Sequence, residues 1–104
     1  PPPGMCATTT ASINLKYARQ MIQQQQYRNA VDALVSILEE DTSCYEAYLY
    51  FGILEIEANG EDGCEAALAS WAMYTIFASP PIEMDDLPEV QPIVAEAYAV
   101  CADQ

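Results

Sequence analysis

One helical pattern of large and small apolar residues occurs twice in this chain, at an offset of 34 residues. The offset aligns Leu15 with Leu49 and Ala18 with Gly52, so that large residues pair with large ones and small with small. Apolar residues spaced three and four apart are typical of amphipathic helices. Glycine costs about 1 kcal/mol relative to alanine inside a helix, so we expect another helix to pack closely against Gly52.

Turn and capping residues place the first two helices. The first is expected from Ser12 to Gln25, with Thr10 or Ser12 as its N-terminal cap. Four glutamines, residues 23–26, form the end of this helix and a short turn. The second helix begins near Tyr27 and ends before a run of acidic residues.

The next two helices have clearer boundaries. Ser43 and Glu46 fit a capping box, in which each side chain accepts a hydrogen bond from the other residue's backbone N–H. The third helix is therefore expected to begin near Cys44 and to run to about Ala58. A turn with two glycines follows, and the fourth helix, residues 64–78, ends before two prolines.

These elements form one domain, because a chain of 104 residues buries a single modest core. The proline-rich start, residues 1–11, is expected to be an extended or disordered arm. The domain itself, residues 12–104, divides into a first helical pair at about 12–42, a second at about 43–79, a linker at 80–87 and a capping helix at 88–103.

A 34-residue period of paired helices resembles the tetratricopeptide-repeat (TPR) family. The resemblance covers about residues 13–80, and the second unit matches best through Tyr48, Phe51, Gly52, Ala67, Trp71 and Tyr74. The first unit departs at Asn14 and Thr42. The resemblance implies an all-α fold of five helices, in which antiparallel hairpins stack as a short solenoid and the last helix covers the fourth. A generic antiparallel bundle is the alternative, because any packed hairpin needs small residues at close approaches.

Charge is distributed unevenly along the chain. The net charge is −13, and residues 39–104 carry fifteen acids and no base. This balance disfavours nucleic acid and anionic membranes and favours a basic partner, although an acidic face also simply keeps a domain in solution. No apolar run reaches the roughly 18–20 residues that span a bilayer, so we expect a soluble chain without membrane insertion.

The four cysteines are Cys6, Cys44, Cys64 and Cys101, and an even number suits disulfides in an oxidising compartment. If the helices alternate in direction, the first two lie at one end of the domain and the last two at the other. This predicts the pairs Cys64–Cys101 and Cys6–Cys44. The alternative is four reduced thiols acting as small apolar side chains. Paired cysteines indicate a periplasmic or secreted protein, and reduced ones a cytoplasmic protein.

The sequence lacks the usual residues and motifs for catalysis and metal binding. The chain has no His, no Cys-x-x-Cys, no Gly-rich phosphate loop and no nucleophile beside a recognisable base, so we expect no enzyme, no metal and no cofactor. Residues 57–65 resemble a calcium loop but lack its glycine and closing glutamate.

The resemblance implies that the first helix of each repeat lines a concave partner-binding groove. By alignment, that groove comprises Leu15, Lys16, Arg19, Ile22, Gln23, Glu46, Leu49, Tyr50, Ile53, Ile56 and Glu57. Tyr50, Ile53 and Ile56 are the most informative of these, because Tyr17 and other residues suffice for the buried side of the helices. The alternative is that the fifth helix folds into the groove and uses these residues as core.

Two functions follow from these observations. The preferred one is an adaptor or assembly chaperone that holds a basic or amphipathic segment of a partner protein in the groove. One subgroup of TPR proteins, the carboxylate clamp, grips acidic C-terminal tails with basic residues in its groove. That function is not expected here, because Lys16 and Arg19 are the only bases in the predicted groove. The alternative is an inhibitor or immunity-type protein whose Glu61, Asp62, Asp85 and Asp86 cover a basic partner surface.

Overall fold

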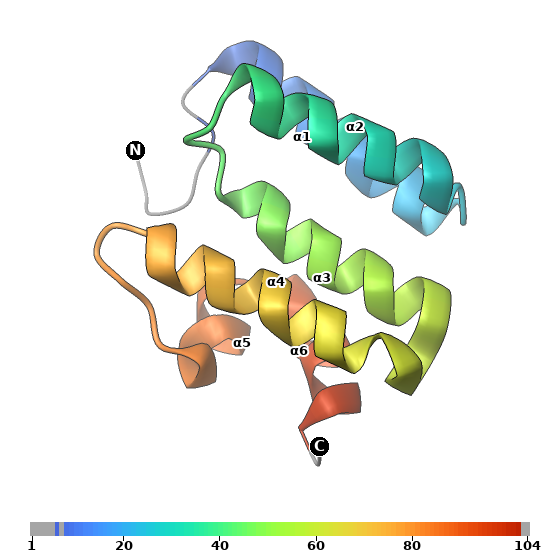
Figure 1. Cartoon of the computed structure of the whole chain (residues 1–104), viewed down its shortest axis with the longest axis vertical. Coiled ribbons are helices and arrows are strands. Elements are labelled where there is room, and N and C mark those ends of the chain that lie inside the picture. Colours follow the sequence, from blue (N-terminus) through green and yellow to red (C-terminus); the bar gives the residue numbers. More distant parts are fainter. Residues whose placement is uncertain (1–5, 7, 103–104) are drawn as a thin grey trace.

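The computed structural model describes residue 6 and residues 8–102, and every regular element in that part of the chain is helical (Figure 1). The all-α fold is therefore confirmed. The elements are α1 (Thr9–Gln23), α2 (Tyr27–Glu40), α3 (Glu46–Asn59), the 3₁₀ turn η1 (Gly60–Gly63), α4 (Cys64–Phe77), the 3₁₀ turn η2 (Met84–Asp86), α5 (Leu87–Val90) and α6 (Pro92–Cys101).

Two antiparallel hairpins form the body of the molecule. Helix α1 packs against α2, α3 packs against α4, and the two hairpins meet mainly through α2 and α3 (Figure 1). Helix α6 packs against both α3 and α4, and α1 also contacts α3. Helix α3 therefore lies at the centre of the molecule. The stacking of these hairpins as a repeat solenoid stays a prediction.

The close approach predicted at Gly52 is confirmed. A Cβ atom at this position would collide with the indole ring of Trp71 on α4. Trp71 is fully buried, and its Nε1–H donates a hydrogen bond to the Leu49 carbonyl at 3.1 Å. The missing side chain thus lets the α4 indole reach the backbone of α3, and this contact holds the second hairpin together.

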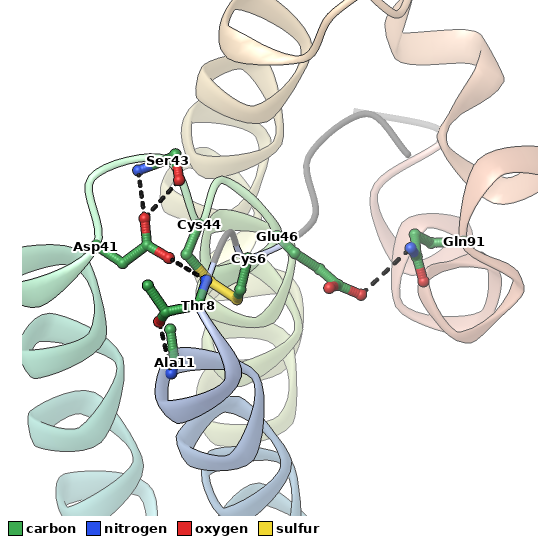
Figure 2. Close-up of a disulfide and its surroundings, with 8 residues drawn as sticks. All are labelled: Cys6, Thr8, Ala11, Asp41, Ser43, Cys44, Glu46 and Gln91. Atoms are coloured by element: carbon green, nitrogen blue, oxygen red, sulfur yellow. Dashed lines mark hydrogen bonds between the residues drawn. A yellow bond between two sulfur atoms is a disulfide. The ribbon is translucent and has the colours of Figure 1, made fainter. Parts of the chain in front are cut away.

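The N-terminus of α1 differs from the prediction. The helix begins at Thr9, and its cap is Thr8, whose hydroxyl accepts a hydrogen bond from Ala11 N–H at 3.0 Å, rather than Thr10 or Ser12. Residues 9–11 of the expected arm are therefore helical, while residues 1–5 and 7 lie outside the described part. The Thr8 N–H also donates to the Asp41 carboxylate at 3.2 Å (Figure 2), which ties the start of α1 to the end of α2.

The predicted capping box of α3 is wrong. Helix α3 begins at Glu46, and Tyr45 at its cap position makes no side-chain capping hydrogen bond. Ser43 instead donates both its backbone N–H and its hydroxyl to the Asp41 carboxylate (Figure 2). Both hydrogen-bond donors of Ser43 thus pair with the Asp41 carboxylate rather than with Glu46. Helix α3 begins at Glu46, two residues later than expected.

Both predicted cysteine pairs are present. Cys6 is joined to Cys44, which connects the segment before α1 to the loop before α3 (Figure 2). Cys64, at the start of α4, is joined to Cys101, at the end of α6, with 5.6 Å between their Cα atoms. The second pair ties the C-terminal helix to the second hairpin.

The expected capping helix is divided in two. Gln91 has extended backbone angles between α5 and α6, as is favoured at a residue directly before a proline. Leu87 and Val94, one on each piece, are fully buried. As expected, α6 contacts the fourth helix, α4, and it also packs against α3, which matches part of the alternative expectation.

Candidate functional site

A pocket of about 220 Å³ opens between α1, α3 and α6. Each helix contributes residues three and four positions apart, which lie on one face of a helix. They are Arg19, Ile22 and Gln23 from α1, Tyr50, Ile53 and Glu57 from α3, and Ile93, Glu96 and Ala97 from α6, with Gln25 from the turn after α1. The pocket is thus shared by the first hairpin, the second hairpin and the C-terminal segment.

The pocket is lined by apolar side chains together with polar and charged ones. The side chains of Ile22, Ile53 and Ala97 are buried, whereas Ile93 remains 43% exposed at the opening. Glu57 and Glu96 are exposed and contribute two carboxylates to the lining. An apolar interior beside two acids suits a ligand that combines an apolar group with positive charge.

Arg19 and Tyr50 form a cation–π pair inside this site. The guanidinium carbon lies 5.3 Å from the centre of the Tyr50 ring, within the range in which the ring face attracts a cation. Burial raises the pKa of the Tyr50 hydroxyl, and the charge of Arg19 opposes that rise. The Arg19 side chain therefore lies over the buried Tyr50 ring and is itself exposed.

Glu46 lies one helical turn before Tyr50 and connects the site to the α5–α6 junction. Its carboxylate accepts a hydrogen bond from Gln91 Nε2 at 3.4 Å (Figure 2). Burial raises the pKa of Glu46 above the ordinary value of a glutamate, and the charge of Arg19 and the Gln91 hydrogen bond partly offset that rise. The junction before α6 thus rests on a half-buried acid at the start of α3.

The eleven predicted groove residues separate into four groups. Six of them line the pocket: Arg19, Ile22, Gln23, Tyr50, Ile53 and Glu57. Leu15, Leu49 and Ile56 are buried in the core away from the pocket lining, Lys16 is exposed on α1, and Glu46 meets Gln91. The role of these residues in binding a partner stays a prediction.

The burial of Tyr50, Ile53 and Ile56 has a cause within the chain itself. All three are less than a tenth exposed, and α6 packs against α3, which fulfils part of the alternative expectation that the last helix folds into the groove. Tyr17, which was expected on the buried side, is 55% exposed instead. Helix α6 therefore covers part of the predicted groove, and a pocket remains between α1, α3 and α6.

Four pocket residues were missed by the sequence-based prediction: Gln25, Ile93, Glu96 and Ala97. Ile93 and Ala97 lie on the apolar face that the sequence assigns to the last helix. That face was expected to cover the fourth helix, with docking into the groove as the alternative. An apolar stripe wide enough to contact two helices was the available signal.

Comparison of the chain with protein-family models, with curated proteins and with solved structures found no match. Within the described residues, no helix has the length and apolar character needed to cross a membrane. In the same part of the chain, no three cysteine or acidic side chains are grouped closely enough to hold a metal ion.

Proposed function

We propose that this protein is a protein-binding module that takes up a basic, amphipathic segment of a partner in the pocket between α1, α3 and α6. One observation carries this proposal: a pocket lined by apolar side chains, two exposed acids and Arg19 lies where the two hairpins and the C-terminal helix meet. Such a site anchors one apolar side chain and favours positive charge beside it.

The size of the pocket favours a side chain over a free small molecule. Sites for small molecules usually measure about 300–1,000 Å³, whereas this pocket measures about 220 Å³. A single large apolar side chain fills a space of this order and buries its surface among Ile22, Ile53 and Ile93. The bound segment is then held by one anchor and by contacts at the edge.

The charges in the pocket lining favour particular residues next to the apolar anchor of the bound segment. Glu57 and Glu96 attract lysine or arginine, and the net charge of −13 steers a basic partner toward the molecule. Arg19 already covers the Tyr50 ring at 5.3 Å. An aromatic or branched apolar residue with a basic neighbour is therefore the preferred sequence.

The TPR-like recurrence supports the same class of function. A 34-residue offset between α1 and α3, with a small residue where α3 and α4 approach each other, is consistent with a short repeat module that acts as an adaptor or assembly chaperone. The two cysteine pairs favour an oxidising, periplasmic or secreted location. We propose no enzymatic activity and no cofactor for this module.

The acidic inhibitor is the weaker candidate. Its residues Glu61, Asp62, Asp85 and Asp86 are all exposed, as that function requires. However, η1 precedes α4 and η2 follows it, so the two acidic pairs lie toward opposite ends of that helix (Figure 1). They do not form one continuous patch that covers a single active site.

A peptide-display selection against the full chain tests the pocket. We expect selected peptides to share one large apolar residue with lysine or arginine beside it. The Ile93→Glu variant should weaken their binding at least about tenfold, because its exposed carboxylate must lose water when the apolar residue of the peptide covers this position. Fluorescence anisotropy with a labelled selected peptide measures the change.

Ile76→Glu is the matched control. It makes the same change of charge and size on α4, at a position that is 65% exposed and outside the pocket, so it should bind selected peptides like the unmodified chain. Ile93 is also exposed and lies in the first turn of α6, where a glutamate suits the helix dipole. Equal affinities of the two variants would reject the pocket as the binding site.

A further inference from the structure

A cluster of aromatic rings lies on the face of α3 opposite the pocket. Because each residue advances about 100° around a helix, Tyr48 and Phe51 lie on the side of α3 away from Tyr50 and Ile53. The rings of Tyr48 and Phe51 are 6.4 Å apart, and those of Tyr48 and Phe77 are 6.2 Å apart. Tyr45 stacks on Phe77 at 5.1 Å. These four rings, Tyr45, Tyr48, Phe51 and Phe77, are called the ring cluster below.

The ring cluster is accessible to a partner. Phe77 is 40% exposed, and the other three rings are half-buried. Met73, one helical turn before Phe77 on α4, is also exposed. Aromatic and methionine side chains are enriched at protein interfaces, and four adjoining half-exposed rings form a larger apolar area than scattered surface residues do.

The electrostatic surroundings of the ring cluster are negative. Helices α2 and α4 both end at the end of the molecule where α3 begins, as the loops beside them show (Figure 1), and neither has a basic residue in its last turn. The C-terminal end of a helix carries about half a negative charge, which attracts cations. The partial charges of two helices therefore add to one another beside the rings.

Acidic side chains lie at one of these helix ends. Glu39 and Glu40 are in the last turn of α2, and both are exposed. The chain has no lysine or arginine after Arg28, which lies at the opposite end of α2. Nothing basic within residues 39–104 neutralises this region.

We propose that the ring cluster is a second docking surface, which binds an arginine-bearing segment of a partner protein. A guanidinium is planar, stacks on aromatic faces and donates hydrogen bonds to carboxylates and helix carbonyls at the same time. Aromatic rings near two helix C-termini and the carboxylates of Glu39 and Glu40 offer each of these contacts. Lysine, a compact and strongly hydrated charge, gains less from the ring faces.

This surface is independent of the pocket. The two sites lie on opposite faces of α3, and they share none of the residues that define them. A chain with both sites holds two segments at once, either from one partner or from two. An adaptor requires this second contact, which the pocket alone does not supply.

A labelled peptide of alternating arginine and glycine tests the proposal on the full chain near physiological ionic strength. Replacing both Tyr48 and Phe77 with leucine keeps the net charge and much of the apolar area but removes two ring faces. We expect the affinity for the arginine peptide to fall about fivefold or more, which corresponds to the usual strength of exposed cation–π contacts. The lysine–glycine peptide should bind more weakly and should lose less.

Two further variants complete the test. Tyr17→Leu removes an exposed ring from α1, and Ile93→Glu blocks the pocket; neither should weaken binding of the arginine peptide. If the double variant loses its helical circular dichroism, Phe77→Leu alone carries the test, because that ring is already 40% exposed. Unchanged affinity in the folded ring variant, or equal losses for the arginine and lysine peptides, would overturn the proposal.

Discussion

The two hairpins have the same small-residue pattern but are held together differently. In the second, Gly52 admits the Trp71 ring, whose indole N–H donates to the Leu49 carbonyl. In the first, the aligned positions hold Ala18 and Leu34, which are both fully buried, and no tryptophan is present. The second hairpin is therefore built on one specific interlock, whereas the first relies on general helix packing.

Position in the molecule explains this difference. Helix α3 is contacted by α1 and α2 from one side and by α4 and α6 from others, so apolar residues occur around much of its circumference. Helices α1 and α2 form an outer layer that leaves Ile13, Tyr17 and Val35 more than a third exposed. The same repeated pattern therefore has different surroundings in its two copies.

Loss of the Cys64–Cys101 pair should have the largest effect on the second hairpin. Replacing both residues with alanine opens a crosslink that spans 37 residues, and the chain-entropy estimate for such a loop is about 4 kcal/mol. Because α6 forms one wall of the pocket, affinity for pocket-selected peptides should fall as well. Urea denaturation and peptide binding measure the two effects.

The Cys6–Cys44 pair is the matched control, because it spans 38 residues. Replacing it should lower the free energy of unfolding by a similar amount, since the closed loops are nearly equal in length. Peptide affinity should be preserved in the folded protein, because this pair does not tie α6. Equal losses of peptide affinity in both variants would contradict the proposed anchoring of the pocket by α6.

Gly52→Ala tests the interlock directly. Alanine is normally better than glycine in a helix by about 1 kcal/mol, but here its Cβ would collide with the Trp71 ring. We expect a net destabilisation of about 2 kcal/mol, typical of overpacking in a close-packed core. Chemical denaturation gives the value.

A double-mutant cycle separates this collision from other effects. In a Trp71→Leu background the large ring is absent, so Gly52→Ala should cost much less. Ala18→Gly, at the aligned position of the first hairpin, should cost about 1 kcal/mol through helix propensity alone. A stabilising effect of Gly52→Ala in the unmodified background would disprove the interlock.

The smallest expected effect concerns Glu46, whose counterpart in the first hairpin is the exposed Ser12. Burial raises the pKa of Glu46 above its ordinary value of 4.5, so the folded state binds its proton more tightly than the unfolded state does. The stability linked to this group is therefore fully present below the unfolded pKa and decreases as pH rises through the folded pKa.

Comparison of the unmodified chain with Glu46→Gln isolates this group. As pH falls from neutral toward the ordinary glutamate pKa, the unmodified chain should gain stability relative to the variant. The gain should be a few tenths of a kcal/mol, because the carboxyl is only half-buried and solvent screens it. Thermal unfolding across this pH range shows the trend, and an opposite slope would contradict the raised pKa.

Local patterns predicted most of the fold. Residue spacing identified the four long helices, Gly52 indicated the close approach of α4, and alternating helix directions gave both cysteine pairs. Each of these depends on neighbours along a helix or on simple up-and-down geometry. They can be derived without knowing how distant surfaces meet.

Two features were not predicted from the sequence: the hydrogen-bond partners of Ser43 and the place where α6 packs. Ser43 fits a capping box, but the Asp41 carboxylate takes both of its donors. The place where α6 docks depends on the path of the segment between Ala78 and Leu87, which local periodicity does not specify. As a result, the prediction missed three pocket residues on α6 and Gln25 in the turn after α1. Six of the predicted groove residues do line the pocket.

Methyl NMR of the isoleucines tests the central claim most directly. Ile22, Ile53 and Ile93 line the pocket, whereas Ile13 and Ile76 are exposed elsewhere on α1 and α4. On titration with a selected apolar and basic peptide, we expect the three pocket methyl signals to shift while those of Ile13 and Ile76 stay in place. Shifts confined to Ile13 or Ile76, with the pocket signals unchanged, would contradict binding between α1, α3 and α6.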